Sequence, residues 1–181
     1  MNSTGRQSRL APRDLAYGGL FGAAALILPV LFHLLHLGRF FMPMYLPLMA
    51  LAFFASPRVC AATAFITPML SALLTGMPPL YPPTAVAMAI ELAVMSSIAS
   101  WAYGRRSGSV LLVLIPVLLM GRVLQACGGY LVGLLVDLPP EFLSVYSVVS
   151  GWPGLVLMVA VIPPLVRLAR GRVKRLQEAS P

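Results

Sequence analysis

The sequence predicts an all-α integral membrane protein: a single bundle of six transmembrane helices with both termini in the cytoplasm. The first supporting observation is composition, because 59% of the 181 residues are hydrophobic and only 10% are charged. Soluble domains average about 45–50% apolar and about 25% charged residues. The second is that the apolar residues form long stretches separated by short breaks. The third is that the basic residues cluster at these breaks, which is typical of membrane topology signals.

A helix needs about 20 mainly apolar residues to cross a hydrocarbon core about 30 Å thick. Six segments meet or approach this length, and a basic tail follows over 170–181. They cover residues 15–37, 41–55, 59–75, 83–103, 110–136 and 146–169. The first is longer than the apolar core of a signal peptide, which has about 7–15 residues, so we expect it to be retained. The chain 1–181 is therefore interpreted as one membrane domain.

Gly and Pro mark the breaks between these segments. The breaks fall at Ser56–Arg58, Gly76–Pro83, Gly104–Gly108 and Asp137–Glu141. The run from Thr75 to Pro83 contains four prolines, which predict a stiff loop. A stiff loop can cover a pocket at a low ordering cost.

The basic residues predict the orientation. If there are six spans, one side of the membrane holds Arg6, Arg9, Arg13, Arg58, Arg105, Arg106, Arg167, Arg170, Arg172, Lys174 and Arg175. Arg39 lies on the other side, and Arg122 lies within a span. Basic loops face the cytoplasm, so both termini are predicted to be cytoplasmic. This placement also accounts for the net charge of +8 without a nucleic-acid partner, and none is expected.

Two charged side chains are predicted to lie at membrane depth, where they are costly without a partner or a function. Glu91 lies in the fourth segment and Arg122 in the fifth, with Gln125 one helical turn further on. One interpretation is that these residues line a pocket that binds a polar ligand. The other is that Glu91 and Arg122 form a structural ion pair between two helices. An acid and a base together would suit a zwitterionic or carboxylate-bearing ligand.

Small residues at a spacing of four let helix backbones approach closely. Gly18 with Gly22, and Gly19 with Ala23, form two such pairs in the first segment. They are interpreted either as packing positions within the bundle or as a surface that docks a separate membrane partner.

Motifs for intramembrane aspartyl or zinc proteases and for phosphate-binding loops are absent from the sequence, so we expect neither catalysis nor ATP hydrolysis. His33 and His36 lack a nearby carboxylate or cysteine that would complete a metal site. Neither a metal nor another cofactor is therefore expected.

Three stretches carry a resemblance to a known family: GRFFMPMYLP at 38–47, SALLTGMPP at 71–79 and AIELA at 89–93. Over residues 15–170 the chain resembles the S components of energy-coupling-factor (ECF) transporters, ABC-type importers of vitamins. These prokaryotic plasma-membrane proteins have six helices and cytoplasmic termini. They capture a water-soluble vitamin from outside, then deliver it through a membrane T component and cytoplasmic ATPase subunits.

The resemblance also implies residue roles. By their placement, Arg39, Tyr81, Glu91, Arg122, Gln125 and Trp152 would bind the substrate. The small residues of the first helix, Gly18, Gly19, Gly22 and Ala23, would dock the T component. The alternative function is a stand-alone secondary transporter of a small molecule.

Overall fold

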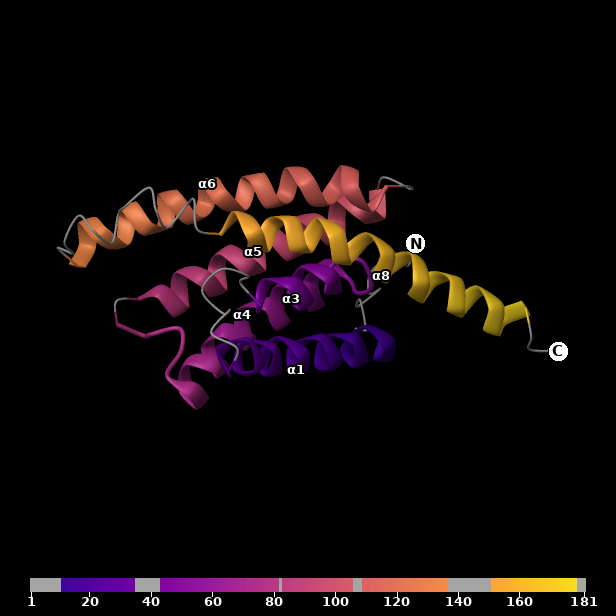
Figure 1. The fold of residues 1–181 in the computed structure, drawn as a ribbon, viewed down its shortest axis with the longest axis horizontal. Coiled ribbons are helices and arrows are strands. Elements are labelled where there is room, and N and C mark those ends of the chain that lie inside the picture. Colours follow the sequence, from indigo (N-terminus) through magenta and orange to yellow (C-terminus); the bar gives the residue numbers. More distant parts are fainter. Residues whose placement is uncertain (1–10, 35–42, 82, 106–108, 137–150, 179–181) are drawn as a thin grey trace, which may run out of the picture.

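The computed structural model describes residues 11–34, 43–81, 83–105, 109–136 and 151–178, with side chains for all of these except 33, 132–136 and 172–178. The described residues form helices joined by short turns, with no strand among them. The helices are α1 (Pro12–Leu34), α3 (Tyr45–Leu51), α4 (Pro57–Thr75), α5 (Thr84–Arg105), α6 (Val110–Val136) and α8 (Trp152–Glu178) (Figure 1).

Five helices are long and apolar enough to cross a membrane. They are α1, α4, α5, α6 and α8, and each overlaps one of the predicted segments. Large apolar side chains are exposed on their outer surfaces, such as Leu20 at 64% and Leu34 at 73%. A soluble monomer rarely exposes so much contiguous apolar surface. The all-helical prediction is confirmed, and the chain has the character of a multi-pass membrane protein.

The predicted segment 41–55 has a different structure from the others. Its described part is the seven-residue helix α3, followed by a turn that runs to Ala55. Nearly every residue of α3 is buried, because α1, α4, α5 and α8 all contact it. The apolar side chains of this segment therefore pack against other helices. The ends of two other predicted segments, at 35–37 and 146–150, lie outside the described residues.

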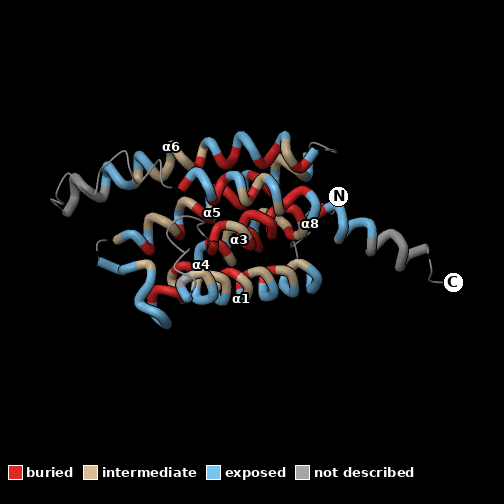
Figure 2. Tube along the Cα trace, viewed as in Figure 1, coloured by how far each residue is buried: buried red, intermediate tan, exposed pale blue. Residues whose placement is uncertain are grey.

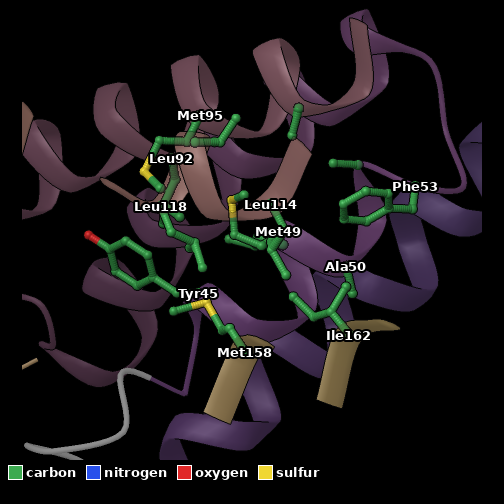
Figure 3. Close-up of a cluster of buried hydrophobic side chains, with 14 of the residues drawn as sticks. Tyr45, Met49, Ala50, Phe53, Leu92, Met95, Leu114, Leu118, Met158 and Ile162 are labelled. Atoms are coloured by element: carbon green, nitrogen blue, oxygen red, sulfur yellow. The ribbon is translucent and has the colours of Figure 1, made fainter. Parts of the chain in front are cut away.

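The helices are arranged around α3 and α5. α1 and α4 lie on one side of the bundle and α6 and α8 on the other (Figure 1). Burial follows this arrangement, with buried residues turned inward and exposed residues outward on each long helix (Figure 2). The centre of the core contains Met49, Leu92, Leu114, Met158 and Ile162 (Figure 3).

Hydrogen bonds also join the ends of the helices. The Ser100 hydroxyl donates a 2.7 Å hydrogen bond to the carbonyl oxygen of Ala55. The Ser56 amide donates a 3.0 Å bond to Oδ2 of Asp14, which links the start of α4 to the start of α1. Hydrogen bonds between helices help to hold these contacts together.

Two glycines allow α1 to approach α4 closely. A Cβ at Gly18 would lie 2.9 Å from Oγ1 of Thr63, and one at Gly22 would lie 3.2 Å from Cγ2 of Thr63. A Cβ at the neighbouring Gly19 would have no atom within 4 Å. The two small-residue pairs of α1 therefore occupy different surfaces.

Replacing Gly18 with leucine is expected to destabilise the α1–α4 contact, because overpacking of a close contact costs about 1–3 kcal/mol. Gly19→Leu provides the matched control, and we expect it to leave the stability nearly unchanged. Thermal unfolding of both variants in detergent tests this difference. Equal melting temperatures would show that α1 does not pack against α4 through Gly18.

Candidate ligand-binding site

A cluster of polar groups lies where four elements of the bundle meet. Tyr45 is the first residue of α3, Glu91 belongs to α5, Arg122 belongs to α6, and Gly151 immediately precedes α8. Four segments that are distant in the sequence thus each contribute one group to the same region.

Glu91 is held by the hydroxyl of Tyr45. That hydroxyl donates a 3.1 Å hydrogen bond to Oε2 of Glu91, which joins α3 to α5. Tyr45 itself is 7% exposed. Its ring lies beside Met158 and its hydroxyl points away from the apolar cluster (Figure 3). Glu91 as a whole residue is partly buried.

Arg122 links α6 to the start of α8. Its Nη2 donates a 2.6 Å bond to the carbonyl oxygen of Gly151, and its Nη1 donates a 2.8 Å bond to Oε1 of Gln125. Hydrogen bonds from a charged group are stronger than neutral ones. Arg122 also lies within electrostatic reach of Glu91 and of the Tyr45 hydroxyl. The acid and the base therefore belong to one site, and each has a hydrogen bond that joins two segments.

Glu91 and Arg122 lie within helices that are long and apolar enough to cross a membrane. Glu91 follows the first residue of α5 by seven positions, which corresponds to about 10 Å along a helix with a rise of 1.5 Å per residue. Arg122 is near the middle of α6. Within the described part of the chain, no buried side-chain nitrogen or oxygen lacks a hydrogen-bond partner, which meets the strict requirement of an apolar surrounding.

The side of the cluster that faces the core is apolar. Met95 lies one turn after Glu91 on α5, is 2% exposed, and occupies the space that a side chain at Gly121 would fill. Leu118 and Met158 continue this surface (Figure 3). Charged groups next to thioether and leucine side chains suit a ligand that has both a polar and an apolar part.

The remaining predicted substrate residues are placed differently. Tyr81 is 77% exposed, in the turn before α5, and Trp152 is 51% exposed, at the start of α8 next to Gly151. Arg39 lies outside the described residues. The structure thus brings together Glu91, Arg122 and Gln125 of the predicted set.

The proline-containing loop before α5 is attached to the helices on both sides. Ser71 donates a 2.7 Å hydrogen bond to the carbonyl of Met77, and Thr84 donates a 2.8 Å bond to that of Pro79. Gly76 ends α4 with a φ of 71°, in the left-handed region that glycine tolerates best. These bonds attach the loop to α4 and α5.

The four predicted docking residues divide into two pairs. Gly18 and Gly22 are buried against α4, whereas Gly19 and Ala23 are exposed on the outer surface of α1. Only the second pair is accessible to a partner in this structure.

Sequence reasoning did not select Tyr45, Gly121 or the carbonyl of Gly151 as parts of the site. Tyr45 lies near the start of the predicted segment 41–55, where tyrosine is a common interfacial residue, and a backbone carbonyl has no sequence signature. Two signals were available in the sequence. Tyr45 lies in the stretch 38–47 that carries the family resemblance, and Gly121 directly precedes the only deeply placed arginine.

Among the described residues, no group of three or more His, Cys, Asp or Glu side chains could hold a metal ion. Comparisons of the chain with protein-family models, with curated proteins and with solved structures find no match.

Proposed function

We propose that this protein is the substrate-capturing S component of an ECF-type importer, located in a prokaryotic plasma membrane with both termini cytoplasmic. The observation that carries the proposal is the cluster of Tyr45, Glu91, Arg122 and Gln125 at membrane depth. Buried ionisable groups in membrane helices are costly and are most often kept for a ligand or an ion.

The position of the cluster supports capture from outside. The N-terminal ends of α5 and α8 lie near the cluster, and the Arg-bearing ends of these helices lie at the opposite end of the bundle. Under the positive-inside rule the Arg-bearing end is cytoplasmic, so the cluster faces the outer half of the membrane. Many water-soluble vitamins combine a charged group with an apolar ring. Such a ligand matches the acid, the base and the apolar side chains of Met95, Leu118 and Met158 beside them.

The test is uptake in cells that lack their own vitamin importers. The chain is expressed with a T component and two ATPase subunits, and uptake is measured for a panel of radiolabelled water-soluble vitamins. We expect accumulation of one vitamin that requires all the subunits and stops when the ATPases are inactivated. Accumulation without the ATPases would instead indicate a stand-alone secondary transporter.

The exposed pair on α1 is the docking surface in this proposal. Ala23→Leu is expected to weaken co-purification with the T component at least tenfold, because a bulky side chain prevents close approach of two helices. Leu34→Ala, also exposed on α1 but without a small-residue partner, is the control. Unchanged co-purification of Ala23→Leu would place the docking surface on another helix.

A further inference from the structure

An open groove of about 420 Å³ lies between α1 and α4, away from the polar cluster. Its sides are mainly apolar, and they include Leu15, Gly19, Ala62 and Ile66. Leu15 and Ile66 are 54% and 58% exposed, so the groove opens toward the lipid.

Arg58, in the first turn of α4, also lines the groove and is exposed. The start of α4 is linked to the start of α1 by the bond from the Ser56 amide to Asp14. The basic end of the groove therefore coincides with the ends of the helices, which is the depth of lipid headgroups.

The surroundings of Arg58 add positive charge at this end of the bundle. Three further arginines lie over aromatic rings here: Arg13 over Tyr17 at 5.4 Å, Arg105 over Trp101 at 4.1 Å and Arg170 over Tyr103 at 4.7 Å. Among the residues whose side chains the structure describes, Asp14 is the one acid at this end. Among the side chains that the structure describes, this end of the bundle thus carries a net positive charge.

We propose that the groove is a binding site for one anionic phospholipid. Its acyl chain lies between α1 and α4 along Gly19, and its headgroup phosphate reaches Arg58. An apolar channel that ends at a cation matches the division of a phospholipid into an apolar tail and an anionic head. Basic side chains at headgroup depth attract anionic lipids. The site is separate from the ligand cluster, shares Gly19 with the proposed docking surface, and is tested without the partner proteins.

Native mass spectrometry tests this proposal on the full chain without partner proteins. The protein is transferred to detergent with equal amounts of phosphatidylglycerol and phosphatidylcholine that carry the same acyl chains. We expect one retained phosphatidylglycerol per chain. Arg58→Gln should lower the preference for phosphatidylglycerol by about fivefold, which corresponds to about 1 kcal/mol for one basic side chain.

Gly19→Leu tests the apolar part of the site. The new side chain has open space, since no atom lies within 4 Å of its Cβ position, and it fills the groove. We expect at least a tenfold loss of the retained lipid with an unchanged melting temperature. Ile27→Ala, exposed on α1 but not among the residues that line the groove, should retain the lipid.

Three results would overturn the proposal. They are equal retention of the two lipids by the unmodified chain, unchanged retention in Gly19→Leu, and a dimer of the chain in place of a lipid adduct.

Discussion

Replacing Glu91 with glutamine is expected to weaken ligand binding by about 10- to 100-fold and to leave the fold intact. Glutamine keeps an oxygen that can accept the bond from the Tyr45 hydroxyl, so the main loss is the negative charge. A hydrogen bond to a charged group contributes about 1.5–3 kcal/mol, which is roughly 10- to 100-fold in affinity. Titration of the captured vitamin into the purified variant, followed by calorimetry, measures this loss. Its melting temperature is the control for folding.

Combining this change with Arg122→Gln separates the two interpretations of the charged pair. If Glu91 and Arg122 only join helices, each single variant should lose stability because it leaves a buried charge uncompensated. The double variant should then recover that stability. The two single variants and the double variant should all bind the ligand as the unmodified chain does. The ligand-contact account predicts instead that the double variant binds no better than the weaker single variant.

Gly121→Leu is expected to destabilise the contact between α5 and α6. A side chain at Gly121 would meet the sulfur and terminal methyl of Met95, which is only 2% exposed. Overpacking in a filled core costs about 1–3 kcal/mol or more. Because Met95 lies directly below Glu91 on α5, ligand binding should fall together with the melting temperature.

Two comparisons make this prediction specific. Gly129→Leu lies on the same helix and has no atom within 4 Å of its Cβ position, so it should melt like the unmodified chain. Shortening Met95 to alanine in the Gly121→Leu background should restore part of the lost stability. If Gly121→Leu and Gly129→Leu melt at the same temperature, α5 and α6 do not approach each other at Gly121.

The long helices could be predicted closely from the sequence. The predicted segment 110–136 has the bounds of α6, and 83–103 differs from α5 by two residues or fewer at each end. The length of each apolar stretch between Gly and Pro breaks predicts where a long helix begins and ends. The segment 41–55 is equally apolar, but composition does not distinguish contact with lipid from contact with other helices. That difference was needed to predict α3 as a short buried helix.

The candidate site could be predicted in part for a similar reason. A charge in an apolar helix is conspicuous, so Glu91 and Arg122 were found. Their partners Tyr45 and Gly151 were not, because they come from other segments that only the tertiary fold brings near. The four-residue spacing on α1 likewise gave two candidate surfaces. The rotation of the helix, which turns Gly18 toward Thr63 and leaves Gly19 exposed, decides between them.

The most direct test of the central claim is native mass spectrometry of the detergent-purified chain beside its Glu91→Gln variant. The account predicts one vitamin-sized molecule per chain of the unmodified protein, and its loss from the variant. The absence of any such adduct from the folded, unmodified chain, even after incubation with a panel of water-soluble vitamins, would contradict a role in substrate capture.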